Sequence, residues 1–179
     1  KNLCEIDNIK GCTREPQEVL ITLGEIGKGI ILRDVPGIGE SIERGEEYRE
    51  LYKNMIPELD AIIWIFKADD RALEAEERTY KEIFDKNFPP LVFVINQIDK
   101  LEPLFDWEIN ANKPGKDKQK NINEKIKIVS EQFDFSEEWI IPISSTQKYN
   151  LATVIDKIVE RLPSSKKIAF VNNVEEEII

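Results

Sequence analysis

The chain has 179 residues, of which 41% are hydrophobic and 34% are charged, and its formal net charge is −10 at pH 7. This profile is typical of a folded globular protein, and the length suffices for one domain with a sizeable core. The acidic balance argues against sequence-independent binding of nucleic acid over the whole surface. Histidine is absent and Cys4 and Cys12 are the only cysteines. This disfavours a zinc site or a histidine-based triad. The two cysteines, eight residues apart, could form a disulfide; we favour buried or idle thiols in a reducing cytosol, which predicts a cytoplasmic protein.

Two apolar runs in the first part of the chain predict an antiparallel hairpin. Residues 19–25 and 29–35 are apolar enough for strands, and a glycine-rich turn separates them. Residues 1–18 show no clear period and predict an exposed loop. Residues 43–59 carry apolar side chains at helical spacing, so we expect a helix there.

Strands and helices alternate over the rest of the chain. Residues 60–66 and 91–95 are continuous apolar runs, typical of strands buried on both faces, and residues 139–143 predict a third short strand. Residues 101–119 form a polar connection that is long enough to indicate a functional loop. The predicted helices are 71–86, 120–133 and 150–162. This alternation predicts an α/β domain with a mainly parallel sheet and one antiparallel hairpin strand.

The segment Asp-Val-Pro-Gly at residues 34–37 directly follows the second predicted strand. A carboxylate at a strand end, followed by proline and glycine, is the layout of a switch segment that faces a metal-bound phosphate. Asp34 can hold Mg²⁺ through water, and the N–H of Gly37 can approach a phosphate because no Cβ blocks it. The alternative is an ordinary turn, since Asp-x-x-Gly is common in turns.

The segment Asn-Gln-Ile-Asp-Lys at residues 96–100 follows the next buried strand along the sheet. The carboxylate of Asp99 can accept two hydrogen bonds from a ring N–H and an exocyclic amine, a pair that guanine presents and adenine does not. Asn96 is expected to tie the loop together, and the stem of Lys100 to cover the plane of the base. A polar turn between a strand and a helix is the alternative.

A third polar cluster, Ser144, Ser145 and Thr146, follows the last predicted strand. It can supply a backbone N–H to the guanine oxygen and hydroxyl groups that brace the loop at residues 96–100; by itself it also fits an ordinary loop. The carboxyl ends of parallel strands meet at one edge of a sheet, which is where ligands bind in such folds. We therefore expect the three clusters to form one site.

These three segments resemble recognition motifs of P-loop GTPases. Thr13, in the segment Cys-Thr-Arg-Glu-Pro, matches the switch threonine that contacts Mg²⁺ in the GTP state. Together with Asp-Val-Pro-Gly-Ile-Gly-Glu at residues 34–40 and Lys-Ala-Asp-Asp-Arg-Ala-Leu at residues 67–73, it is similar to the Era- and Der-like branch of the translation-factor class. More narrowly, residues 4–163 resemble bacterial ribosome-binding GTPases.

The resemblance implies a Ras-like three-layer α/β/α fold and a GTP-binding, GTP-hydrolysing molecular switch that uses GTP or GDP and Mg²⁺. Thr13 and Asp34 would hold the metal, and with Gly37 they would act at the γ-phosphate. The implied base-binding residues are Asn96, Gln97, Asp99, Lys100, Ser144, Ser145 and Thr146. A pseudo-GTPase interaction module, which keeps the fold without hydrolysis, is the alternative.

The sequence departs from the family pattern at three points. It contains no phosphate loop of the form Gly-x4-Gly-Lys-Ser/Thr, which would precede Thr13, so we expect a fragment that lacks the first strand and binds nucleotide weakly or not at all. We assign the truncated GTPase domain to residues 1–163 and a tail of unknown role to 164–179. Ile38 replaces a water-orienting glutamine, which predicts slow hydrolysis and an activating partner. Ser-Ser-Thr replaces the usual Ser-Ala-Lys.

One basic island stands out on this acidic chain. Six lysines lie between Lys113 and Lys127, against one aspartate and one glutamate. One hypothesis is that they contact the ribosome and its RNA, or an anionic membrane surface to which the protein is then peripheral. A solvated loop and helix face is the alternative, and it is the one we favour.

Overall fold

The computed structural model describes residues 16–22, 29–37, 45–84 and 88–167. The chain divides into two compact units. Lys1–Ile56 and Pro163–Ile179 form the terminal unit, and Pro57–Leu162 form the central unit. The assignment of a domain to residues 1–163 and of a tail to 164–179 stays a prediction. No helix in the described part of the chain is long and apolar enough to cross a membrane.

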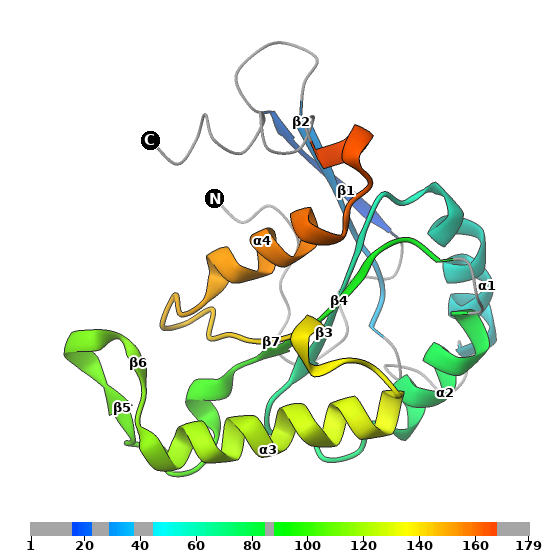
Figure 1. The fold of residues 1–179 in the computed structure, drawn as a ribbon. Helices are drawn as coiled ribbons and strands as arrows, with labels where there is room; N and C mark the ends of the chain where they lie inside the picture. Colours follow the sequence, from blue (N-terminus) through cyan, green and yellow to red (C-terminus); the bar gives the residue numbers. More distant parts are fainter. Residues whose placement is uncertain (1–15, 23–28, 38–44, 85–87, 168–179) are drawn as a thin grey trace. The chain divides into compact units, whose positions relative to one another are not determined.

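The central unit is built on a parallel sheet of three strands in the order β3-β4-β7. These are β3 (Ile62–Lys67), β4 (Leu91–Asn96) and β7 (Ile140–Pro142). In Figure 1, α3 and α4 run along opposite faces of this sheet, and α2 lies beyond one end of α3. The helices span Glu74–Ile83 (α2), Lys116–Phe133 (α3) and Leu151–Arg161 (α4).

The core of the central unit lies around β4, whose first five residues are buried. Phe93 contacts the rings of Phe66, Tyr80 and Phe133 on one face of the sheet. These rings prefer edge-to-face geometry because of their quadrupoles, and the Phe66 and Phe93 rings lie at 84° to one another. The prediction of a strand buried on both faces is confirmed for β4.

The same prediction is wrong for β3, which lies at the edge of the three-stranded sheet. Trp64 and Phe66 pack inward, but the side chains of Ile63 and Ile65 are 40% and 60% exposed. Helix α4 packs against β4, and the face of β3 that carries Ile63 and Ile65 is not covered to the same extent. A continuous apolar run therefore did not suffice to predict burial on both faces.

The terminal unit contains the predicted antiparallel hairpin. It consists of β1 (Gln17–Thr22) and β2 (Gly29–Asp34), paired from Gln17 opposite Asp34 to Thr22 opposite Gly29. Helix α1 (Gly45–Met55) follows, and a short 3-10 helix, Ile56–Glu58, ends it at the predicted place. Together with the parallel sheet of the central unit, this hairpin confirms the α/β fold class with a mainly parallel sheet.

The connection after β4 is more structured than its polar sequence predicts. It contains a small antiparallel hairpin, β5 (Trp107–Glu108) and β6 (Lys113–Pro114), with a 3-10 turn at Ile109–Ala111. Figure 1 shows this hairpin beyond the N-terminal end of α3. Helix α3 begins at Lys116 rather than at residue 120. The helical turn at 116–119 was missed because lysines mask its periodicity.

Candidate functional site

The central unit brings two of the three predicted clusters together. β4 and β7 run parallel, with Ile95 opposite Pro142, so their carboxyl ends lie side by side. The N–H of Ile143 donates to the carbonyl of Ile95 at 2.8 Å, and the N–H of Ile98 donates to the carbonyl of Ile143 at 3.3 Å. Residues 96–101, the first loop, therefore lie directly beside residues 144–149, the second loop.

Asn96 joins these two loops through a single side-chain oxygen. Its Oδ1 accepts hydrogen bonds from the N–H of Gln97 at 2.7 Å and from the N–H and hydroxyl of Ser145 at 3.2 and 3.1 Å. Gln97 has a φ of 66°, so the chain turns sharply as it leaves the strand. Lys100 extends back across this turn, and its Nζ donates to Oε1 of Gln97 at 2.9 Å.

Asp99 lies in a single 3-10 turn, Ile98–Lys100, and is partly buried. Its Oδ1 accepts a hydrogen bond from the hydroxyl of Ser144, which is itself fully buried. The same hydroxyl accepts from the N–H of Gln147 at 3.0 Å, so its own direction is fixed. Within the described part of the chain, no hydrogen bond reaches Oδ2 of Asp99. One carboxylate oxygen is thus held in place while the other is open to a donor.

The second loop is held in shape by its own backbone. The N–H of Ser144 donates to the carbonyl of Tyr149 at 3.3 Å, and the N–H of Tyr149 donates back at 2.9 Å. The N–H of Ser145 is engaged by Asn96. Thr146 is exposed, and its backbone N–H has no hydrogen-bond partner among the described residues.

Lys118 is the residue that the sequence interpretation missed. Its side chain has no exposed surface, and its Nζ donates to the backbone carbonyls of Asp99, at 2.9 Å, and Leu101. Burial lowers the pKa of Lys118, and the charges of Asp99, Asp106 and Glu102 oppose that shift. A sequence signal was present, since Lys118 lies four residues before Ile122 and so falls on the apolar stripe of α3.

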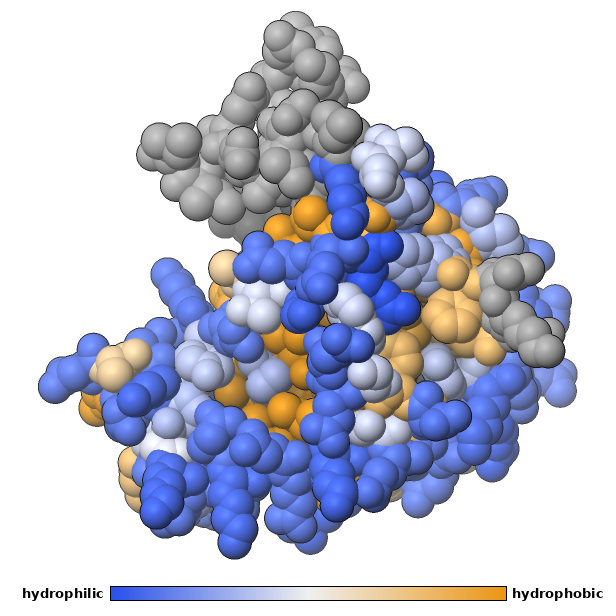
Figure 2. All heavy atoms as spheres, viewed as in Figure 1, coloured by the Kyte–Doolittle hydropathy of each residue, from blue (hydrophilic) through white to orange (hydrophobic). Residues whose placement is uncertain are grey.

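Lys118 and Lys125 show that the favoured interpretation of the basic island is partly wrong. Lys125 is half-buried, its Nζ donates to the carbonyl of Asp70, and burial lowers its pKa. Lys113 and Lys127 form ion pairs with Glu108 and Glu131 at 3.2 and 3.7 Å. Among the described residues, only two lysines of the island are exposed without such a partner, Lys116 and Lys120. Figure 2 shows hydrophilic side chains along the outer side of α3.

The switch-like segment belongs to the terminal unit. β2 ends at Asp34, whose side chain is exposed, and the carbonyl of the buried Pro36 accepts a hydrogen bond from the hydroxyl of Tyr52 in α1. Gly37 is the last described residue of this segment, and Thr13 and Ile38 lie outside the described residues. Within the described ranges, no group of three or more carboxylate or thiol side chains is arranged to enclose a metal.

A family profile described as 50S ribosome-binding GTPase matches residues 1–97 of the chain, which is more than half of its length. The chain belongs to this GTPase family. Membership confirms the predicted resemblance, and the matched region includes the segment at residues 34–37.

Several curated proteins are similar to this GTPase-family chain over most of its length. The uncharacterized Escherichia coli K12 proteins YfjP and YkfA are 32% and 31% identical over 159 and 163 residues, covering 88% and 90% of the chain. The GTPase Era of Thermoanaerobacter sp. strain X514 is 26% identical over 139 residues, which cover 77% of the chain. The aligned regions make up 53%, 54% and 40% of these relatives, so the chain spans about half of their length or less.

Two solved structures of Era share the fold. Era in complex with MgGDPNP and nucleotides 1506–1542 of 16S ribosomal RNA is 25% identical, with a TM-score of 0.64. A variant of Aquifex aeolicus Era bound to GDP and AlF4⁻ is also 25% identical, with a TM-score of 0.66. Each match covers 90% of this chain and 49% of the Era chain. The predicted Era-like GTPase fold is thereby confirmed.

Proposed function

We propose that this chain is the guanine-binding part of a GTP-hydrolysing switch, in which the first and second loops hold the base. The carboxylate of Asp99 is the observation that carries the proposal. Ser144 fixes one of its oxygens, and the other has no hydrogen-bond partner among the described residues. Guanine presents a ring N–H beside an exocyclic amine, and the two oxygens of one carboxylate can accept both bonds. Adenine lacks that pair and would leave this partly buried acceptor unmatched.

The remaining loop residues support the same base. The N–H groups of Ser144 and Ser145 are already engaged, so the N–H of Thr146 is left to donate to the guanine oxygen. Gln97 holds the ammonium of Lys100, and the apolar stem of that lysine would cover one face of the ring. Asn96 would act by fixing the distance between the two loops rather than by touching the base.

We assign the phosphate end of the nucleotide to the segment after β2. Asp34 ends a strand with an exposed carboxylate, which suits Mg²⁺, because this ion keeps several of its waters and takes few protein ligands. Thr13 is the second proposed Mg²⁺ ligand, and the N–H of Gly37 would approach the γ-phosphate. The ion would neutralise charge on the phosphates. Ile38 cannot orient the attacking water, so hydrolysis would depend on a partner.

Among the described strands, β3 has a pairing partner on one side only, which supports the proposal that a longer protein supplies the phosphate loop. The sequence contains no Gly-x4-Gly-Lys-Ser/Thr motif, and such a loop contributes backbone N–H groups and a lysine charge to the phosphates. β3 is an edge strand, and Ile63 and Ile65 are exposed on one of its faces. A further strand beside β3 would pair with the backbone N–H and C=O groups of that edge. Without a phosphate loop, this chain would bind nucleotide weakly.

A pseudo-GTPase interaction module is the second candidate function. It is favoured by Ile38, which replaces the water-orienting glutamine, and by the missing phosphate-loop motif. The two candidates share the fold and differ in chemistry. GTP hydrolysis by a form of the protein that carries a phosphate loop before residue 1 would support the switch, whereas guanine-independent partner binding with no hydrolysis would support the module.

Fewer lysines of the basic island are available to contact a polyanion than the sequence indicates. Era is described in complex with 16S ribosomal RNA, but only Lys116 and Lys120 remain exposed and without an ion-pair partner among the described lysines of this island. Two lysines neutralise about two phosphates, which supports only weak and strongly salt-dependent binding. A tight ribosome or membrane contact by this chain would therefore need further basic residues besides Lys116 and Lys120.

The substitution Asp99→Asn tests the guanine proposal in a form of the protein that carries a phosphate loop. It replaces an acceptor by a donor opposite the exocyclic amine, so guanine nucleotides should lose about 100-fold in affinity. Xanthine nucleotides, which have a carbonyl at that position, should bind Asp99→Asn more tightly than they bind the wild type. Isothermal titration with GDP and XDP measures both affinities. Asp156→Asn, at an exposed position of α4, is the matched control. Unchanged base preference in Asp99→Asn would refute the assignment of this loop.

A further inference from the structure

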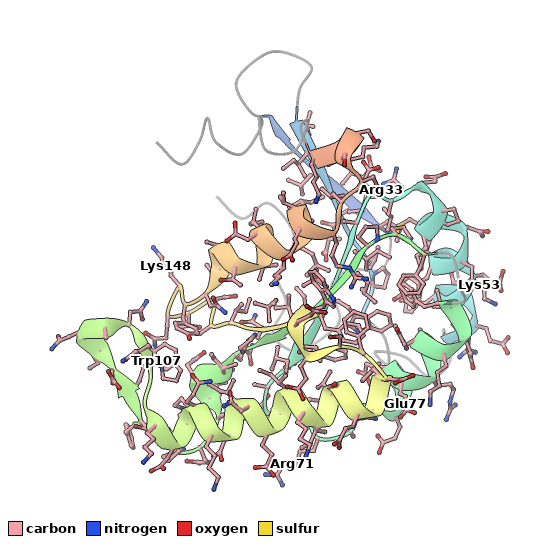
Figure 3. The ribbon with its side chains drawn as sticks, viewed as in Figure 1. Arg33, Lys53, Arg71, Glu77, Trp107 and Lys148 are labelled. Atoms are coloured by element: carbon pink, nitrogen blue, oxygen red, sulfur yellow. The ribbon has the colours of Figure 1, made fainter. Side chains whose placement is uncertain are left out.

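The β5–β6 hairpin contacts the second loop through two of its side chains, those of Trp107 and Asn112. Nε1 of Trp107 donates to Oδ1 of Asn112 at 3.3 Å, and Nδ2 of Asn112 donates to the backbone carbonyl of Gln147 at 2.9 Å. The ring of Trp107 also meets the ring of Tyr149 edge-on, with centroids 5.5 Å apart. Figure 3 shows Trp107 and Lys148 at the same end of the central unit. The hairpin therefore holds the loop that carries Ser144–Thr146.

The base of the same hairpin contacts the first loop through Lys118. Oδ2 of Asp106 accepts a hydrogen bond from the backbone N–H of Lys118 at 2.8 Å, and the Asp106 carbonyl accepts from the N–H of Gly115 at 2.9 Å. The fit is close, since a Cβ on Gly115 would lie 1.8 Å from Oδ1 of Asp106. The ammonium of Lys118 then reaches the carbonyls of Asp99 and Leu101.

A buried ammonium group is an energetically costly way to link two segments of the chain. Taking the charge of Lys118 out of water is costly unless strong acceptors replace the lost hydration. Two backbone carbonyls of the Asp99 turn and the nearby Asp99 and Asp106 charges supply that replacement. Charge-assisted bonds are short and directional, so they restrict the turn more than an apolar contact would. The turn that carries the guanine-reading carboxylate is thereby fixed from behind.

We propose that Lys118 and Asn112 are positioning residues of a clamp that holds the two base-binding loops at a fixed distance. Lys118 holds the first loop at the backbone of Asp99, and Asn112 holds the second loop at the backbone of Gln147. Neither residue is assigned a contact with nucleotide. The inference rests on the proposed function, because the clamp acts on base recognition through Asp99 and Thr146.

Amide hydrogen exchange in the nucleotide-free, 179-residue chain tests the clamp itself. Asn112→Ala should speed exchange at the N–H groups of Lys148 and Tyr149, and Lys118→Met should speed it at Leu101, each by about tenfold. Asn110→Ala and Lys120→Met, at exposed positions nearby, are the matched controls and should exchange as the wild type does. If Lys118→Met fails to fold, Asn112→Ala decides the test. Unchanged exchange at Lys148 and Tyr149 would refute the clamp.

The ratio of the affinities for GDP and IDP tests whether Lys118 and Asn112 position Asp99. NMR titration of the same variants with each nucleotide, up to millimolar concentrations, measures this ratio. IDP lacks the exocyclic amine, so a displaced Asp99 should cost GDP more than IDP, and the preference for GDP should fall about threefold or more in Asn112→Ala and Lys118→Met. Equal losses for both nucleotides would overturn the positioning role. No preference for GDP in the wild type would instead refute the proposed function, and faster exchange in the variants would then show the clamp to be only structural.

Discussion

Glu76, in the first turn of α2, is the one described residue with a buried side-chain oxygen that lacks a hydrogen-bond partner, Oε2. Burial raises the pKa of its carboxyl, its own backbone N–H lowers it, and the charges of Asp70 and Glu74 raise it further. The charged form is therefore less stable in the folded chain than in the unfolded chain. The folded chain binds a proton more readily at this position, and its stability falls as the pH rises through the titration.

We predict that Glu76→Gln stabilises the protein at neutral pH, because a neutral amide avoids the cost of a buried charge. A gain of about 1 kcal/mol would raise Tm by about 2–4 °C. The gain should be fully present above the raised pKa of Glu76 and should vanish below pH 4.5, the ordinary value of this carboxyl. Thermal melts of both proteins from pH 4 to 8 measure it. Glu124→Gln, exposed on α3, should show no such pH-dependent gain.

At the scale of elements, β3 and β4 show how little the apolar content of a strand says about its burial. Ile65 and Val94 are register partners in the parallel pair, so their side chains lie on the same face of the sheet. Ile65 is 60% exposed, whereas Val94 is 1% exposed. Both strands are rich in apolar residues, but helix α4 packs against β4 and leaves this face of β3 more exposed.

The difference in burial predicts that the substitution that removes fewer carbons, Val94→Ala, costs more stability than Ile65→Ala. Val94→Ala removes two buried carbons and should lower the free energy of unfolding by about 2 kcal/mol. Ile65→Ala removes three carbons that are largely in water already, and should cost about 0.5 kcal/mol or less. Urea unfolding of both variants measures the difference. A larger loss for Ile65→Ala would show that this face of β3 is covered by something in solution.

At the scale of the whole molecule, the sequence predicted which polar residues follow neighbouring strands better than it predicted the side-chain contacts of Lys118 and Asn112. Asp99 and Ser144 meet because both follow strands of one parallel sheet, which is a rule of topology that motifs and apolar runs reveal. The burial of Lys118 depends on where α3 begins, and lysines at its N-terminus hid that point. The contact of Asn112 with Gln147 depends on a hairpin inside a polar connection that has no strong strand propensity.

One cluster of buried side chains in the described part of the chain lies within the central unit, which bears on how the chain folds. The buried side chains of this core extend from Phe66 to Ile140, and the partly buried groups packed against them lie between Ile62 and Tyr149. Both ranges fall within Pro57–Leu162. The contacts of the two base loops and of the clamp also fall within this range. A unit with its own core and its own loop contacts meets the physical requirements of an independently folding domain.

We therefore predict that residues 57–162 fold cooperatively without the terminal unit. The isolated unit should give a dispersed NMR spectrum and a single thermal transition, because all the buried rings around Phe93 are retained. The amides of Ile98 and Tyr149, which donate across and within the two loops, should keep the shifts that they have in the full chain. Phe93→Ala in the isolated unit is the negative control and should abolish the transition, since it removes about 3–5 kcal/mol. A collapsed spectrum from the unmodified unit would instead mean that the terminal unit completes its core.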